Sequence, residues 1–126
     1  MPERIYPTVA ETIETHRLLI EEFGGALGLR DKGALEAAVL RPQSGYYNNV
    51  IEEAVALMES LANNHAFIDG NKRISFVMTD VMLRANGYFI EVEPLAAHKF
   101  ITDALKESEF RFSEIRDWLI SNTRAL

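Results

Sequence analysis

Residues 71–86 read NKRISFVMTDVMLRAN and are followed by Gly87, and this stretch is the main evidence for the predicted fold. Its apolar residues go most of the way round a helical cylinder, which is the pattern of a buried helix. They are Ile74, Phe76, Val77, Met78, Val81, Met82 and Leu83. Asn86 and Gly87 supply a helix stop. We therefore expect a central buried helix here, with the rest of the chain packed around it.

Two helices are predicted in the first third of the chain. Thr8 followed by Glu11 is a capping-box pattern, and the helix that it starts should stop at residues 23–25, FGG. Asp31 is a suitable cap for a second helix, and Pro42 marks its end. Both helices carry apolar residues at helical spacing, so each should pack one face on the core.

The segment that follows is predicted as a loop and then a third helix. Residues 41–49, RPQSGYYNN, hold turn-forming residues around Tyr46 and Tyr47. Residues 50–64 carry one apolar stripe at three- and four-residue steps, which predicts an amphipathic helix. His65 lies at the C-terminal end of this helix.

The last third of the chain predicts one extended piece and two helices. Residues 88–92 favour a short extended segment, and Pro94 starts a helix through Lys106. Ser113 is a suitable cap for a last helix through about residue 123, with Trp118 in the core. The class is therefore all-α: a compact helical bundle around a central buried helix, with one short extended segment, in a single domain over residues 1–126.

Composition excludes several functions. The 126 residues include no cysteine, which rules out disulfides, thiolate metal sites and a cysteine nucleophile. The net charge of -6 argues against a general nucleic-acid binder. No apolar run is long enough to span a membrane and the N-terminus lacks a secretory pattern, so we expect a cytoplasmic protein. His16 and His98 share no ligand spacing, and we expect surface or packing roles rather than a zinc site.

Residues 65–73, HAFIDGNKR, combine a histidine, an aspartate, a glycine and two cations just before and within the central helix. A helix N-terminus carries partial positive charge, so Asp69 is expected there, whereas Lys72 and Arg73 are locally unfavourable. An anion such as phosphate would explain them, because the first-turn N–H groups would point at it and Gly70 would let the backbone approach.

The other residues of this stretch fit chemistry on a phosphate. Asp69 could hold Mg²⁺ against phosphate oxygens, since Mg²⁺ favours one or two carboxylates plus phosphate. His65 could accept a proton from an attacking hydroxyl, and Phe67 would anchor the loop in the core. A structural interpretation stays open for each residue: residues 69–71 form an ordinary turn with an aspartate cap, His65 satisfies the last carbonyls of its helix, and the cations are solvated.

HAFIDGNKR resembles the signature of the Fic/Doc (Fido) family, H-x-F-x-[D/E]-G-N-[G/K]-R, with the lysine of its Doc branch, the death-on-curing toxins. The resemblance extends to EEFGG, GLRDKGALEAAVLRPQ and RANGYFI, and covers about residues 15–118. It implies the helical Fido fold. It also implies that His65 is the catalytic base, that Asp69 holds Mg²⁺, and that Phe67 is the structural anchor.

The resemblance further implies that Gly70 and Asn71 form a backbone anion hole and that Lys72 and Arg73 contact nucleotide phosphates. The implied catalytic set is His65, Asp69 and Arg73. Fic-branch enzymes transfer AMP from ATP to a protein hydroxyl, whereas Doc-branch toxins are protein kinases that phosphorylate a threonine of elongation factor Tu and block translation. A lysine at position 72 fills the space that a glycine would leave for a diphosphate, which favours phosphoryl transfer.

Two departures from the family pattern bear on this interpretation. Ala66 replaces a proline that is common in the Fic branch, which weakens the AMP-transfer alternative. Asn63 and Asn64 stand where some relatives place a basic residue that helps to bind phosphate, so the number of phosphate contacts is open. An AMP-transferring enzyme and a non-catalytic phosphate-binding module remain the alternatives. Tyr46 and Tyr47 either line the flap that positions a target or pack over the core.

The resemblance also implies partners. Doc-branch toxins pair with a small antitoxin whose disordered C-terminal part folds onto the toxin. The inhibitory pattern of many Fic-branch proteins, [S/T]-x-x-x-E-[G/N], does not occur in this sequence. An external inhibitor of that kind is therefore expected, together with a protein target and ATP as the phosphoryl donor.

Overall fold

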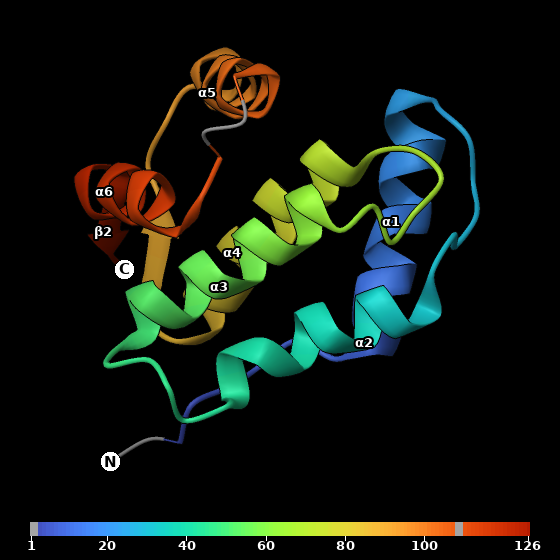
Figure 1. Cartoon of the computed structure of the whole chain (residues 1–126). Helices are drawn as coiled ribbons and strands as arrows, with labels where there is room; N and C mark the ends of the chain where they lie inside the picture. Colours follow the sequence, from blue (N-terminus) through green and yellow to red (C-terminus); the bar gives the residue numbers. More distant parts are fainter. Residues whose placement is uncertain (1–2, 108–109) are drawn as a thin grey trace.

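The computed structural model describes residues 3–107 and 110–126, which are mainly helical with a small two-stranded sheet (Figure 1). The elements are α1 (Val9–Phe23), α2 (Lys32–Leu40), the short 3-10 helix η1 (Arg41–Gln43), α3 (Val50–Asn63), α4 (Asn71–Ala85), β1 (Tyr88–Ile90), α5 (Pro94–Lys106), α6 (Phe112–Asn122) and β2 (Thr123–Ala125). The predicted all-α class is confirmed.

Side chains cap the N-termini of the first three helices. Thr8, Asp31 and Asn49 each accept a hydrogen bond from a backbone N–H in the first turn of α1, α2 and α3, at 3.1, 3.0 and 2.9 Å. At α1 the side chain of Glu11 also bonds back to the N–H of Thr8, which completes the predicted capping box. Each cap satisfies a donor that the helix itself cannot, and stabilises the fold by about 1 kcal/mol.

The most buried helix is α3, which crosses the middle of the molecule with α4 behind it in Figure 1. Leu57 and Met58 are fully buried, and so is Ala56, which lies outside the single apolar stripe. Small alanines let neighbouring helices approach α3 from several sides, so this helix and not α4 is the centre of the bundle. The sequence prediction was wrong on this point because alanines contribute little to a hydrophobic pattern.

Helix α4 buries one face and leaves another open. Ile74, Met78 and Met82 are fully buried against the core, whereas Val81 is 41% exposed. Its polar Ser75 and Thr79 are buried too, and each donates its hydroxyl proton to a backbone carbonyl of its own helix at 2.6 Å. Helix α4 is therefore amphipathic, and some of the apolar residues that the sequence predicted to be buried face outward.

The two strands form an antiparallel pair in which Tyr88 is opposite Ala125 and Ile90 is opposite Thr123. The predicted extended segment is confirmed in β1. Its partner β2 was not predicted, because the sequence pattern placed Thr123 in the last helix. In the structure the backbone of Thr123 is extended and begins β2. Ser113 does not cap α6 either. The helix begins one residue earlier, at Phe112, and the hydroxyl of Ser113 donates to the carboxylate of Glu114.

Aromatic contacts join the last two helices. The ring of Phe100 on α5 stacks on Trp118 of α6 with centroids 4.6 Å apart, and contacts Phe110 at 5.7 Å. Ile115 and Leu119 of α6 are fully buried, while Trp118 is half-buried at the edge of the core. This cluster fixes α5 in position beside α4, and that position creates the site described below.

The segment between α2 and α3 is partly helical rather than a plain loop. Its first three residues form η1, and the hydroxyl of Tyr47 accepts a 2.7 Å hydrogen bond from Nε of Arg41. The ring of Tyr47 also stacks on Phe112, whereas Tyr46 is 83% exposed. Tyr47 thus packs against the body of the molecule, as one of the two interpretations expected.

Across residues 3–107 and 110–126, every helix is too short or too polar to cross a lipid bilayer.

Candidate functional site

A short loop, residues 64–70, connects the C-terminus of α3 to the N-terminus of α4, and a side chain of α4 holds it closed. The amide oxygen of Asn71 accepts from the N–H of Phe67 at 3.1 Å, and its amide nitrogen donates to the carbonyl of Phe67 at 2.9 Å. Phe67, the expected anchor, is 2% exposed. The loop is therefore held by the two hydrogen bonds of the Asn71 side chain and by the buried side chain of Phe67.

The connection between α1 and α2 runs alongside this loop. Leu29 pairs with Phe67 as an isolated antiparallel bridge, and the N–H of Ile68 donates to the carbonyl of Gly28 at 3.0 Å. The carbonyl of Ala66 accepts from the N–H groups of Arg30 and Asp31. Segments at least 35 residues apart in the sequence are thus bonded through their backbones, which gives the loop a second rigid support.

A buried histidine of α1, His16, contacts the loop through both its ring face and its Nε2. The ring of His16 is 3% exposed and stacks on Phe67, with ring centroids 3.9 Å apart and an angle of 10° between the planes. Its Nε2 lies 2.7 Å from the carbonyl oxygen of Asp69, and since a carbonyl only accepts, Nε2 carries the proton. Sequence reasoning assigned His16 a surface or packing role and missed this bond, because no local spacing connects residues 16 and 69.

The carboxylate of Asp69 does not cap α4. Its Oδ2 accepts from the N–H of Ala26 at 3.0 Å and its Oδ1 accepts from the N–H of Gly70 at 2.8 Å. These hydrogen bonds, the one from Ala26 foremost, lower the pKa of Asp69 below its ordinary value. A Cβ at Gly25 would lie 2.7 Å from Oδ2, so the glycine makes room for an ionised, oriented carboxylate.

The N-terminus of α4 is left open. Gly70 occupies the cap position in a left-handed conformation with φ 77°, and no side chain bonds to the first turn. The N–H groups of Asn71, Lys72 and Arg73 therefore have no acceptor within the part of the chain that the structure describes. Unsatisfied donors at a helix N-terminus favour an anion.

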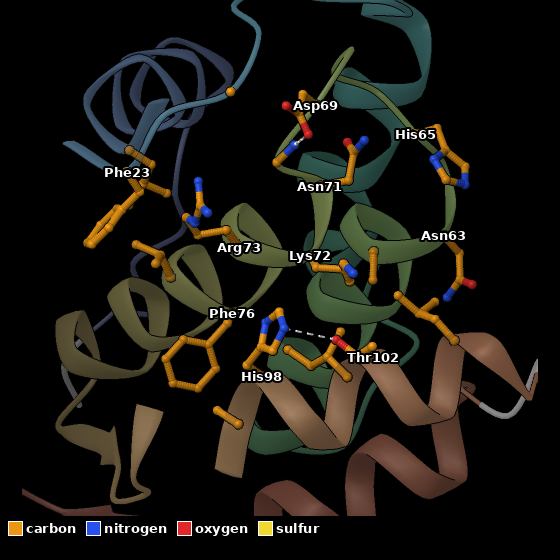
Figure 2. Close-up of a pocket in the computed structure, with 18 of the residues that line it drawn as sticks. Phe23, Asn63, His65, Asp69, Asn71, Lys72, Arg73, Phe76, His98 and Thr102 are labelled. Carbon is orange, nitrogen blue, oxygen red and sulfur yellow. Dashed lines mark hydrogen bonds between the residues drawn. The ribbon is translucent and has the colours of Figure 1, made fainter. Parts of the chain in front are cut away.

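The two cations of the first turn point in different directions. The guanidinium of Arg73 lies over the ring of Phe23, 5.2 Å from its centroid, and its NH1 donates to the carbonyl of Gly24 at 3.4 Å. Lys72 is exposed and forms no ion pair with any residue in the described ranges. Figure 2 shows Arg73 turned toward Phe23 and Lys72 pointing away from Phe23.

His65 is held in an uncommon backbone conformation. It lies two residues beyond the end of α3, rather than within it, and has φ 50°, which places it in the left-handed region. Histidine tolerates this region better than most side chains, at a cost of the order of 1 kcal/mol. The conformation turns the chain out of α3 and leaves the imidazole exposed beside the loop.

The polar residues of the loop and of the first turn of α4 line one cavity of about 1200 Å³ between α1, α3, α4 and α5 (Figure 2). His65, Asp69, Gly70, Asn71, Lys72 and Arg73 all contribute to its wall. The charged lining residues that the structure describes are Lys72, Arg73, Lys106 and Asp69, which makes this wall cationic in a chain of net charge -6. Phe67 lies outside the wall and supports it.

Other lining residues were not predicted for the site. The amide of Asn63 lines the cavity but donates to the carbonyls of Glu59 and Phe110, both at 2.9 Å, so this side chain is already occupied. From α5 come His98 and Thr102, one helical turn apart. Nothing local in the sequence marks them, because only the docking of α5 beside α4 brings them to the site.

Tyr46 and Tyr47 do not line this cavity. A metal held by the protein alone has no support in residues 3–107 and 110–126, where no three acidic or histidine side chains cluster suitably. Asp69 is the one carboxylate among the described lining residues. A single ionised carboxylate beside an anion site suits Mg²⁺, which completes its shell with water and phosphate oxygens.

Comparison with known proteins identifies the family. The model of the Fic/DOC family matches residues 6–83, more than half of the chain. The chain is 46% identical over 70 residues to a protein named Toxin Doc from Mycolicibacterium smegmatis (strain ATCC 700084 / mc(2)155), a match that covers 52% of this chain and 54% of that protein. It is 28% identical over 113 residues to a protein named Protein kinase doc from Escherichia phage P1, covering 86% and 88%.

The matched segment thus spans about half the length of the mycobacterial relative and most of the phage relative. The resemblance that the motif at residues 65–73 predicted is confirmed, and both relatives carry the Doc name. The chain belongs to the Fic/Doc family and, within it, to the Doc branch.

Proposed function

We propose that this chain is the toxin of a toxin–antitoxin pair and transfers a phosphoryl group from ATP to a protein hydroxyl. The observation that carries the proposal is that His65, Asp69, Lys72 and the free N–H groups of α4 open into one cavity with a cationic wall. The names of the two relatives, Toxin Doc and Protein kinase doc, support it.

The N-terminus of α4 is the proposed phosphate site. The free N–H groups of Asn71, Lys72 and Arg73 lie together in the first turn of α4, and Gly70 has no side chain to cover them. The ammonium of Lys72 adds a mobile positive charge close to these donors. Fixed dipoles and cations aimed at the transferring group are the main contribution of a protein to phosphoryl transfer.

His65 is the proposed general base. Its exposed imidazole accepts the proton of the target hydroxyl as that oxygen forms a bond to the γ-phosphorus, while the bond from this phosphorus to the β,γ-bridging oxygen breaks. The products are the phosphorylated hydroxyl and ADP, and the proton stays on the imidazole until it is lost to solvent. The left-handed conformation at His65 sets the direction from which the base approaches.

Asp69 is the proposed ligand for Mg²⁺. Its lowered pKa keeps the carboxylate ionised, and its bonds to the loop backbone orient it toward the cavity. Bound there, Mg²⁺ would neutralise charge on the phosphate oxygens of ATP.

Lys72 favours phosphoryl over AMP transfer. A glycine at this position would leave the first turn of α4 open for a diphosphate, whereas the lysine side chain fills part of that space. A cation here also suits a phosphoryl group that carries charge on three oxygens.

The proposed macromolecular partners follow from the same assignment. The target is a threonine hydroxyl of elongation factor Tu, whose modification blocks translation. The inhibitor is a small antitoxin whose disordered C-terminal segment folds onto this chain.

The test is the intact mass of elongation factor Tu after incubation with this chain, ATP and Mg²⁺. We expect an increase equal to one phosphoryl group. In the His65→Asn variant the rate should fall by roughly 10²–10⁴-fold, the usual contribution of general base catalysis. Asparagine is the appropriate replacement because it also tolerates the left-handed conformation, so the helical content and unfolding temperature should stay near wild type.

Three other outcomes would contradict the proposal. An adenylyl-sized increase would assign the chain to AMP transfer in spite of Lys72. An unchanged rate in the His65→Asn variant would remove the histidine from the mechanism. No mass change in elongation factor Tu or in any protein of a cell extract would favour a non-catalytic module.

A further inference from the structure

Three cations lie close to the loop of residues 64–70 but outside the cavity, and the proposed mechanism does not use them. They are Arg30, Lys32 and Arg111. All three are exposed, and within residues 3–107 and 110–126 none of them forms an ion pair. Every described cation other than these three and those of the cavity wall pairs with a carboxylate. Unpaired positive charge is thus concentrated around this loop.

Hydrogen bonds place two of these cations on either side of His65 along the loop. The N–H of Arg30 donates to the carbonyl of Ala66 at 2.7 Å. The carbonyl of the residue before Arg111 accepts from the side-chain amide of Asn63 at 2.9 Å. Asn63 and Ala66 are three residues apart and can be separated by at most about 11 Å. The exposed imidazole of His65 therefore lies between the two arginines, and Figure 2 shows it at the same edge of the site as Asn63.

The fold does not explain why these positions are cationic. Arg30 precedes the cap of α2, Lys32 begins α2, and Arg111 occupies the cap position of α6, and a positive charge is locally unfavourable at each of these places. The acid between the first two cations, Asp31, already accepts from the N–H of Ala34. The charges are therefore available to another molecule, although the chain as a whole has a net charge of -6.

We propose that Arg30, Lys32 and Arg111, the docking cations, bind an acidic surface of the protein that carries the acceptor hydroxyl. The proposal rests on the proposed function and names the class of acceptor. Because the phosphates occupy the cavity at the N-terminus of α4, the acceptor hydroxyl reaches His65 from outside the cavity. A protein that approaches there meets the docking cations. Carboxylates near its hydroxyl then steer the encounter and fix its orientation.

A nucleic acid fits this surface less well. Proteins that bind nucleic acids neutralise many phosphates along a broad basic surface. Here three cations flank a single exposed histidine, in a chain whose net charge is negative. A few carboxylates of a protein match that arrangement, whereas a long row of phosphates does not.

The experiment measures the KM for the acceptor, which is the protein whose mass rises in the test of the proposed function. Arg30→Gln and Arg111→Gln remove the charge and keep much of the side-chain length. Because both side chains are exposed and the contacts with the loop come from the backbone, the variants should fold as wild type does. We expect each to raise this KM about threefold and the double variant about tenfold, with kcat and the KM for ATP within about twofold of wild type.

Arg124→Gln is the matched control, because it removes the same charge from an exposed position on β2, far from the loop of residues 64–70 in Figure 1. It should leave the KM for the acceptor unchanged. Salt provides a second measurement: raising the ionic strength from about 50 to about 300 mM should raise the KM of wild type several-fold, and that of the double variant much less. Thermal unfolding of each variant verifies that it is folded at the assay temperature.

The outcomes separate this inference from the proposed function. An unchanged KM in the double variant would overturn the docking surface and leave the proposed function intact. A rise in KM that occurs only with an acceptor carrying bound nucleic acid would assign the docking cations to nucleic acid and also overturn the inference. A fall in kcat without a change in KM would place these cations in the chemistry and not in docking. If wild type modifies no protein of a cell extract, the proposed function fails together with the inference.

Discussion

The N-termini of α2 and α4 show two different uses of an aspartate beside a helix. Asp31 caps α2 by accepting from the N–H of Ala34, as the sequence predicted. Asp69 stands next to α4 in the same kind of sequence, yet its carboxylate bonds to Ala26 and Gly70 and leaves the first turn of α4 uncapped. Asp31 therefore caps its helix, whereas Asp69 binds the backbone of the loops beside the cavity.

The difference indicates what each end contributes. A capped N-terminus satisfies its donors internally and adds stability, whereas an open one keeps its donors for an external anion. The N-termini of α5 and α6 also lack side-chain caps, but Asp69, Lys72 and Arg73, three of the charged lining residues that the structure describes, lie at the N-terminus of α4. The comparison therefore predicts that changes at Asp69 affect activity and changes at Asp31 affect stability.

Among changes at the two aspartates and their supports, the largest expected effect is that of Asp69→Asn on transfer. The amide keeps the size of the side chain but removes the negative charge, so the rate of target modification should fall by on the order of 10²-fold or more. The measurement is the initial rate of phosphorylation by intact mass under saturating ATP. A rate within threefold of wild type would show that Asp69 is a structural residue of the loop, like Asp31 at α2.

His16 should have a smaller effect. In His16→Phe the ring can still stack on Phe67, but the hydrogen bond to the carbonyl of Asp69 is lost, and we expect kcat to fall about tenfold, the equivalent of one hydrogen bond that orients the loop. His16→Gln keeps a donor and should recover much of the rate. Both rates are measured well below the unfolding temperature of each variant.

The control for His16 is the comparison of those two variants. A positioning role requires that His16→Gln exceed His16→Phe in kcat. Equal rates in the two variants, with equal losses of thermal stability, would leave His16 as a packing residue only.

Asp31→Ala should have the opposite effect to Asp69→Asn: it should lower the stability of the fold and leave the rate of transfer unchanged. Loss of the α2 cap should lower the free energy of unfolding by about 1 kcal/mol, measured by urea denaturation. The rate of transfer at a temperature where the variant is folded should equal that of wild type. A large loss of activity with unchanged stability would contradict the assignment of Asp31 to stability and Asp69 to activity.

The smallest effect concerns acid stability. Because hydrogen bonds from Ala26 and Gly70 lower the pKa of Asp69 in the folded chain, they stabilise the fold at pH values above the unfolded pKa of about 3.9, and this contribution is lost as the pH falls through the folded value. Unfolding temperatures of wild type and Asp69→Asn, measured in EDTA from pH 6 to 2.5, should converge at the acidic end. A constant difference across this range would contradict the assigned cause.

Much of the fold was predictable because its signals are local. Thr8 and Asp31 cap helices by bonding to residues three positions away, and Pro94 starts α5 for an equally local reason. The errors have a shared cause. The burial of α3 depends on neighbours that approach its alanines, and β2 exists because it pairs with β1, which is 35 residues distant along the chain.

The candidate site divides in the same way. The sequence by itself determined the family and the nine-residue motif, since these residues are contiguous and their types state the chemistry. Only the tertiary structure decided that His16 supports Asp69, that Arg73 turns to Phe23, and that α5 adds a wall with His98. The physical reason is distance along the chain: each of these contacts joins segments that meet only after the helices have packed, so no local pattern records them.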